Sequence, residues 1–123
     1  MYRTTLKSIF LFLLLACVVA RAAASDEKPF AERHVILQVS DADPSKYTAV
    51  LDIANNLIKH YNGPEYIEIE IIAFGAGVHM LTGESNQNRS RINSLIANDI
   101  RFYVCKNTLD SIQRKTGVRP PIL

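Results

Sequence analysis

The sequence contains no tryptophan and only two cysteines among its 123 residues. Cys17 lies in an apolar N-terminal stretch, so Cys105 is the only cysteine in the rest of the chain. A disulfide within that remaining part is therefore excluded, and so is a zinc site built from several cysteines. The histidines, His34, His60 and His79, are far apart, and no pair has the spacing of metal ligands. We therefore expect no metal and no other cofactor.

The sequence also lacks a large excess of positive or negative charge. The 14 Lys and Arg residues nearly balance the 12 Asp and Glu residues. Three of the basic residues, Arg3, Lys7 and Arg21, belong to the N-terminal stretch, so the rest of the chain is slightly acidic. No basic run is interleaved with aromatic residues, which is the pattern typical of nucleic-acid binding. We therefore expect no nucleic-acid partner.

Residues 1–24 have the pattern of an export signal. Two basic residues precede an uninterrupted apolar run over 9–20, and the alanines at 22–24 offer a cleavage site before Ser25. The run is shorter than the roughly 20 residues that span a bilayer, so no stable membrane insertion is expected. The pattern predicts an exported, periplasmic protein. The alternative is a lipid anchor on Cys17, because the Leu-Leu-Ala-Cys sequence ending there loosely resembles a lipobox.

The remaining part of the chain is long enough for one small domain. Residues 25–32 are charged and polar and contain a proline, which predicts a flexible arm before a domain over 33–123. Hydrophobic periodicity within this domain predicts strands that alternate with helices. The expected strands cover 34–40, 66–74 and 100–105, and the expected helices cover about 44–61, 87–97 and 107–115. This alternation predicts an α/β domain with a parallel sheet.

The apolar pattern of the strands also suggests their order. Residues 34–40 form an almost continuous apolar run, which is typical of a central strand buried on both faces. In the next strand Glu68 and Glu70 alternate with isoleucines, which indicates a wet face near a sheet edge. We therefore expect the first strand between the second and the third. Ligands bind such sheets at the carboxyl ends of the strands. The segments expected to meet there are 40–43, 75–80 and 105–107.

Cys105 stands at the carboxyl end of the third expected strand, directly before a helix. Asn107 is a candidate N-cap, with Asp110 three residues later as in a capping box. A helix N-terminus and the neighbouring Lys106 both favour a thiolate, so this placement predicts a reactive sulfur. The alternative is that Cys105 is a small apolar residue that closes a core strand.

Four further residues complete the candidate pocket. Gly75 and Gly77 lack the third glycine of a dinucleotide-binding motif, so we interpret them as a turn or a close approach to a ligand. His79 is a candidate base or electrostatic partner for Cys105, or else an ordinary loop histidine. Asp41 is a candidate polar group of the pocket, or else a solvated loop acid.

Three segments of the sequence resemble the DsrE/DsrF-like family, and most of all its exported, single-domain bacterial members. They are HVILQVSD at 34–41, EIEIIAFGAG at 68–77 and FYVCKNTL at 102–109. The resemblance spans about residues 33–115. It implies a three-layer α/β/α fold with a small, mainly parallel sheet, assembled as a dimer, trimer or hexamer. In sulfur-relay members a cysteine at the end of this strand carries a persulfide, and Cys105 matches that position.

The resemblance thus implies a periplasmic sulfur carrier or sulfurtransferase-like protein that exchanges sulfur with a donor or acceptor protein. The alternative is a non-catalytic module for small-ligand binding or oligomeric assembly, with Cys105 in the core. Family members usually continue past the third helix into further strands, whereas this sequence stops at Leu123. C-terminal truncation is therefore one possibility. If the chain is complete, its three-strand sheet leaves an open edge beside the third strand, which a partner subunit can cover.

Overall fold

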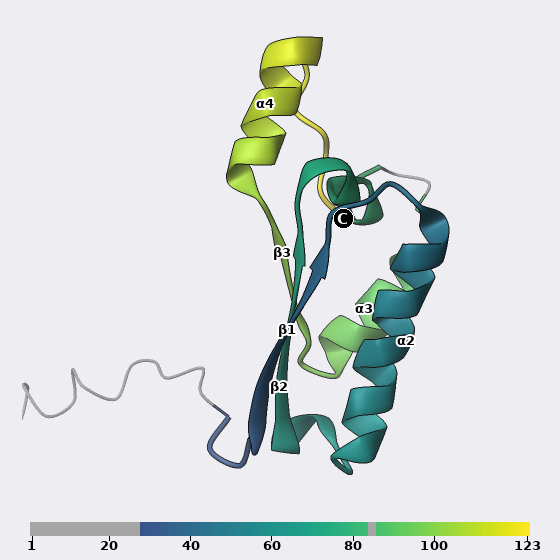
Figure 1. Cartoon of the computed structure of the whole chain (residues 1–123), viewed down its shortest axis with the longest axis vertical. Coiled ribbons are helices and arrows are strands. Elements are labelled where there is room, and N and C mark those ends of the chain that lie inside the picture. Colours follow the sequence, from purple (N-terminus) through teal and green to yellow (C-terminus); the bar gives the residue numbers. More distant parts are fainter. Residues whose placement is uncertain (1–27, 84–85) are drawn as a thin grey trace, which may run out of the picture.

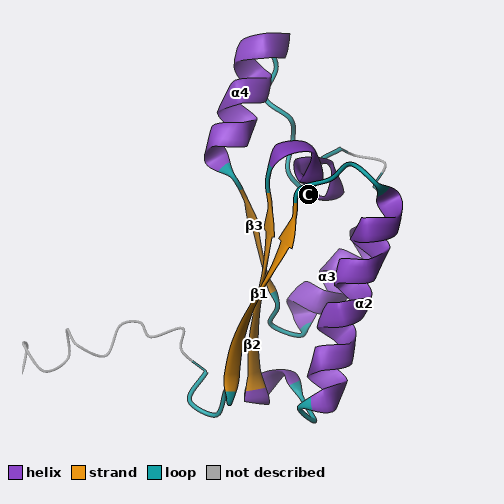
Figure 2. Ribbon diagram, in the orientation of Figure 1, coloured by secondary structure: helices purple, strands orange, loops and turns teal. Residues whose placement is uncertain are grey.

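The structure, a computed structural model, describes residues 28–83 and 86–123. Strands and helices alternate along this part of the chain, as predicted (Figures 1 and 2). The strands are β1 (Arg33–Val39), β2 (Ile67–Ala73) and β3 (Arg101–Val104). The helices are α2 (Pro44–His60), α3 (Arg89–Ala97) and α4 (Lys106–Thr116), with 3-10 helices η1 (Pro64–Tyr66) and η2 (Gly75–Leu81). The predicted export signal and Cys17 lie outside the described residues.

All three strands are parallel, but their order is β1-β2-β3, so the prediction that β1 is central is wrong. β2 is the central strand, and its isoleucines at 67, 69 and 71 are fully buried. Glu68 and Glu70 lie on its other face, which the helices leave open. The alternation in β2 therefore marks an uncovered face and not a sheet edge. β1 is an edge strand although it is rich in apolar residues.

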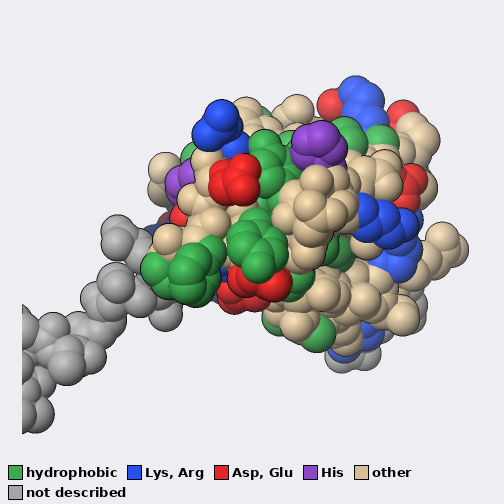
Figure 3. All heavy atoms as spheres, turned by 90° about the horizontal axis from the view of Figure 1, so that it is seen from below, with side chains coloured by type: hydrophobic (Ala, Val, Ile, Leu, Met, Phe, Trp, Pro, Cys, Tyr) green, Lys and Arg blue, Asp and Glu red, His purple; other side chains and the backbone are tan. Residues whose placement is uncertain are grey.

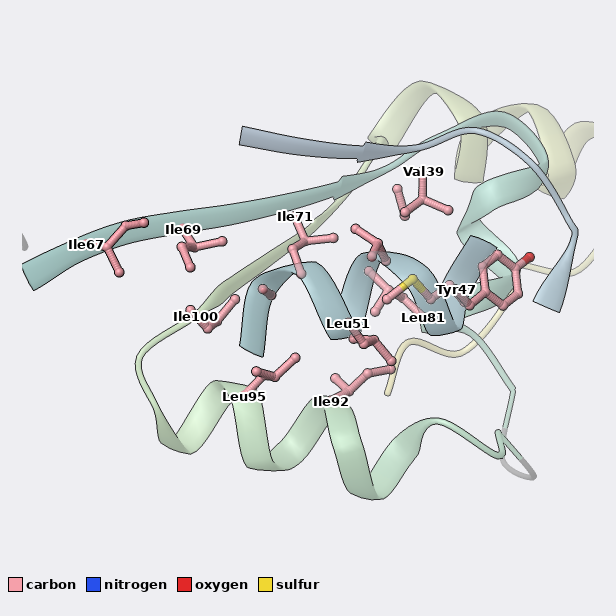
Figure 4. Close-up of a cluster of buried hydrophobic side chains, with 14 residues drawn as sticks. Val39, Tyr47, Leu51, Ile67, Ile69, Ile71, Leu81, Ile92, Leu95 and Ile100 are labelled. Carbon is pink, nitrogen blue, oxygen red and sulfur yellow. The ribbon is translucent and has the colours of Figure 1, made fainter. Parts of the chain in front are cut away.

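The domain is a layered α/β/α fold, as predicted. Helices α2 and α3 cover one face of the sheet, and α4 lies on the other side, beyond the carboxyl ends of the strands (Figures 1 and 4). Helix α4 packs against η2 at the end of the sheet and not across the strands (Figure 1). Most of the second face is therefore bare. On that face Ile36 is 51% exposed and Tyr103 is 43% exposed.

A single hydrophobic core fills the space between the sheet and helices α2 and α3 (Figure 4). Helix α2 begins where the sequence predicts, because the Asp43 side chain accepts a 2.8 Å hydrogen bond from the Ser45 N–H and Pro44 occupies the first turn. The helix contributes its buried stripe to this core. Its members are Tyr47, Val50, Leu51 and Ala54.

Residues 28–32 of the predicted flexible arm are held against the start of the sheet. The Lys28 ammonium, whose side chain is only 9% exposed, donates to the carbonyl oxygens of Pro64 at 2.7 Å and Ile67 at 3.1 Å. It also pairs with the Asp99 carboxylate at 3.0 Å. Hydrophobic and charged side chains are intermingled on this end of the molecule (Figure 3). Within the described residues, the helices are too short or too polar to cross a membrane.

Candidate functional site

The carboxyl ends of the strands are joined by main-chain hydrogen bonds. The N–H of Phe74 donates to the Val39 carbonyl at 3.0 Å, and the N–H of Cys105 donates to the Ala73 carbonyl at 2.9 Å. These bonds continue the parallel ladder one residue past β2 and β3. The segments that follow the three strands therefore start from the same edge of the sheet, as the sequence predicts.

Cys105 itself is the N-cap of α4, so the prediction that Asn107 caps this helix is wrong. Its backbone is extended, and its carbonyl accepts a 3.2 Å hydrogen bond from the N–H of Leu109. Cys105 is therefore the one residue between β3 and α4, which places its thiol beside the first turn of the helix. Cys105 is partly buried and is not in a disulfide. This position places a partly exposed residue beside the N–H groups of a helix start.

Thr108 is the main cause of a lowered pKa at Cys105. Its hydroxyl and its backbone N–H stabilise the thiolate, and the N–H of Asn107 adds to them. Partial burial and the negative charge of Asp110 act in the opposite direction. Sequence reasoning missed Thr108, although a threonine three residues after a helix cap can be recognised as a potential donor to that cap.

The Thr108 hydroxyl is positioned by the loop after β2. The N–H of Gly75 donates to the Thr108 oxygen at 3.1 Å. A threonine hydroxyl has one proton and two acceptor lone pairs, so this contact leaves its proton available for the sulfur of Cys105. Two segments that are distant in sequence thus act together on one thiol.

Lys106 does not act on the thiol in the way the sequence suggested. Its side chain is 81% exposed, and its ammonium pairs with the Asp110 carboxylate at 2.7 Å. Arg119 binds the same carboxylate at 2.5 Å. These two cations, Arg119 foremost, lower the pKa of Asp110 to about 2. Because the ammonium of Lys106 is paired with Asp110, its positive charge is not a cause of the lowered pKa of Cys105.

The two glycines after β2 have different roles in the structure. Gly75 has a positive φ of 54°. A Cβ placed on Gly77 would lie 2.0 Å from the carbonyl oxygen of Val39. The close approach is therefore to the protein's own strand β1 and not to a ligand. Asp41, after β1, pairs with the ammonium of Lys46 at 2.7 Å.

A shallow cavity of about 450 Å³ lies between η2 and one side of α4. It is lined by Gly75, Ala76, His79, Asn107, Thr108, Ser111, Ile112 and Lys115. Three of the predicted pocket residues, Gly75, His79 and Asn107, therefore come together. Asp41, Gly77 and Lys106 lie outside the lining. Because Thr108 lines the cavity and also stabilises the thiolate, the cavity adjoins the Cys105 site.

No family model matches the sequence, and no curated protein matches it. Among solved structures, the fold is similar to that of MTH1491, a protein of unknown function from Methanobacterium thermoautotrophicum, with a TM-score of 0.59 and 24% sequence identity. The match covers 65% of this chain and 68% of that chain. At this identity the likeness shows a shared α/β fold alone.

Proposed function

We propose that this protein is an exported, DsrE-like carrier of sulfane sulfur in which Cys105 is the acceptor. The observation that carries the proposal is the placement of a partly buried, unpaired thiol at the N-cap of α4, where Thr108 and the N–H of Asn107 lower its pKa. A thiolate is the nucleophile in sulfur exchange, so a lowered pKa increases the reactive fraction at neutral pH. The resemblance of the segment 102–109 to the family supports the same assignment.

The reaction requires no cofactor. The Cys105 thiolate attacks the outer sulfur of a donor persulfide, R–S–SH. A new S–S bond forms on Cys105, the donor S–S bond breaks, and R–S⁻ leaves with the bonding electron pair. The persulfide on Cys105 then passes its outer sulfur to an acceptor thiolate by the same step. The cavity lined by Gly75, His79 and Asn107 is the approach route that we assign to donor and acceptor.

A second candidate function is oligomeric assembly without sulfur chemistry. It is favoured by the open face of the sheet, where Ile36 and Tyr103 expose large apolar surfaces, and by the edge of β3, which pairs with no further strand in the described part of the chain. Assembly as a dimer, trimer or hexamer also fits the carrier hypothesis, because a partner subunit can cover this surface. Reactivity of the thiol separates the two functions.

The discriminating experiment is alkylation of Cys105 with iodoacetamide as a function of pH, in the folded protein and in urea. A carrier requires the folded protein to react readily, with a midpoint at a lower pH than the unfolded chain shows. The variant Cys105→Ser is the control for alkylation elsewhere. If the thiol reacts only in urea, the carrier hypothesis fails and the assembly hypothesis remains.

A further inference from the structure

The open face of the sheet carries a polar row that the proposed sulfur chemistry does not use. His34 lies directly across from Glu68 in the pairing of β1 with β2, and Glu70 is the next residue of β2 on the same face. On the other side, Arg101 of β3 lies across from Glu70. The row therefore contains one imidazole, two carboxylates and one guanidinium, drawn from all three strands.

Each of the two carboxylates has one oxygen near Arg101 and the other near His34. The Oε1 atoms of Glu68 and Glu70 face Arg101, which binds Glu68 closely and lies 3.4 Å from Glu70. The Tyr103 hydroxyl adds a 3.2 Å hydrogen bond to Glu70 Oε1. The Oε2 atoms both face His34, with Glu70 Oε2 at 3.3 Å from Nε2 and Glu68 Oε2 at 4.0 Å from Nδ1.

We propose that His34, Glu68 and Glu70 form a binding site for a divalent transition-metal ion, Zn²⁺ in particular. One ligand atom from each residue lies within 4.8 Å of the other two. Ligands at about 2.1 Å in a tetrahedral zinc site stand about 3.4 Å apart, so the 3.3 Å between His34 Nε2 and Glu70 Oε2 is already at that spacing. A small movement of the exposed imidazole or of Glu68 completes the set.

The surroundings favour a metal over a simple ion pair with His34. Because Arg101 and Tyr103 hold the Oε1 atoms, the Oε2 atoms of both carboxylates are fixed toward the imidazole. Groups that orient ligating carboxylates in this way raise metal affinity. Glu68 and Glu70 also carry one more negative charge than Arg101 balances, so a cation is attracted. Imidazole with carboxylate is a ligand set that suits zinc, and three protein ligands leave a fourth position open to solvent.

This site was not predictable from residue spacing. His34 stands 34 residues from Glu68, and only the register of β1 against β2 brings them together. The expectation that no histidine belongs to a metal site was based on the spacing between histidines and cysteines. That spacing contains no information on carboxylates of a neighbouring strand.

The proposal is tested by calorimetric titration of the tag-free protein with ZnCl₂. A Cys17→Ser/Cys105→Ser double variant is used as the background so that neither thiol can bind the metal, which also makes the result independent of the sulfur-carrier function. We expect one Zn²⁺ per chain, and a loss of affinity of at least about tenfold in both His34→Gln and Glu70→Gln. His60→Gln is the matched control, because His60 is an exposed histidine at the end of α2. Its affinity should equal that of the background.

A second measurement keeps the test decisive if Glu70→Gln proves unstable. Zinc that binds only the folded state raises its melting temperature, and this increase should disappear in His34→Gln. His34 is exposed, so its replacement should leave the melting temperature in EDTA unchanged. Zinc binding that is unaltered in His34→Gln, or no saturable binding below about 1 mM, would overturn the proposal.

Discussion

The N–H of Gly75 donates a 3.1 Å hydrogen bond to the hydroxyl oxygen of Thr108, which links the loop after β2 to the first turn of α4. The same hydroxyl is the largest cause of the lowered pKa of Cys105. The environment of the thiol is thus built by two segments that only the fold brings together. The following predictions test this arrangement.

Replacing Thr108 with valine should raise the pKa of Cys105, because valine cannot donate a hydrogen bond to the thiolate. The alkylation midpoint should move to higher pH, and the rate at neutral pH should fall several-fold. The rate on the high-pH plateau should be unchanged, which separates an effect on ionisation from an effect on access. Thr108→Ser retains the hydroxyl and should keep the wild-type profile. Identical profiles for the valine and serine variants would refute the role of the hydroxyl.

Asp110 should act on the thiol in the opposite direction. Its negative charge raises the pKa of Cys105, so Asp110→Asn should shift the alkylation midpoint to lower pH. Lys106→Met should shift it much less than Thr108→Val does, because the Lys106 ammonium is already paired with Asp110 at 2.7 Å. Stopped-flow alkylation across a pH series measures all three variants. A large upward shift in Lys106→Met alone would show that Lys106 acts directly on the sulfur.

The ion pairs of Asp110 should make part of the stability sensitive to acid. Arg119 and Lys106 lower the folded-state pKa of this carboxyl to about 2, below its ordinary value in the unfolded chain. A lowered pKa contributes stability above the unfolded-state value, and this contribution is lost as the pH falls toward 2. Urea unfolding at neutral pH and near pH 2 should therefore show a smaller loss of stability in Asp110→Asn than in the wild type. An equal loss in both proteins would contradict the assignment.

Gly77→Ala should destabilise the fold by about 2 kcal/mol or more, because the new Cβ would overlap the main chain of Val39. Gly83→Ala is the control. Gly83 has a positive φ of 93° but open space around it, so its cost should be only about 1 kcal/mol. Urea unfolding monitored by circular dichroism gives both values. If Gly77→Ala costs no more than Gly83→Ala, the close approach to β1 is not a tight constraint.

Local features of the fold could be predicted from the sequence. The start of α2 follows from Asp43 and Pro44, and the junction of β3 with α4 follows from the change in pattern at Cys105. These features depend on residues adjacent in sequence. The class of fold then follows from the alternation of strands and helices.

The strand order could not be predicted because the same pattern has two explanations. Glu68 and Glu70 would face solvent either in an edge strand or in a central strand with one bare face, and only the packing of the helices decides. The role of Thr108 was missed for a similar reason, since its partner Gly75 comes from another segment. Asn107 was assigned as the cap because its side chain is a better capping group than that of Cys105. The helix nevertheless begins at Lys106, so its cap is Cys105, two residues before Asn107.

The most direct test of the sulfur-carrier function is to expose the folded chain that begins at Ser25, and so lacks Cys17, to polysulfide, remove the excess and determine its mass. The account predicts the gain of a sulfur atom on the wild type and none on Cys105→Ser. Addition of cyanide should then restore the original mass, because cyanide takes the outer sulfur as thiocyanate and leaves the Cys105 thiolate. A folded protein that gains no sulfur, or a Cys105→Ser variant that gains as much as the wild type, would contradict the account.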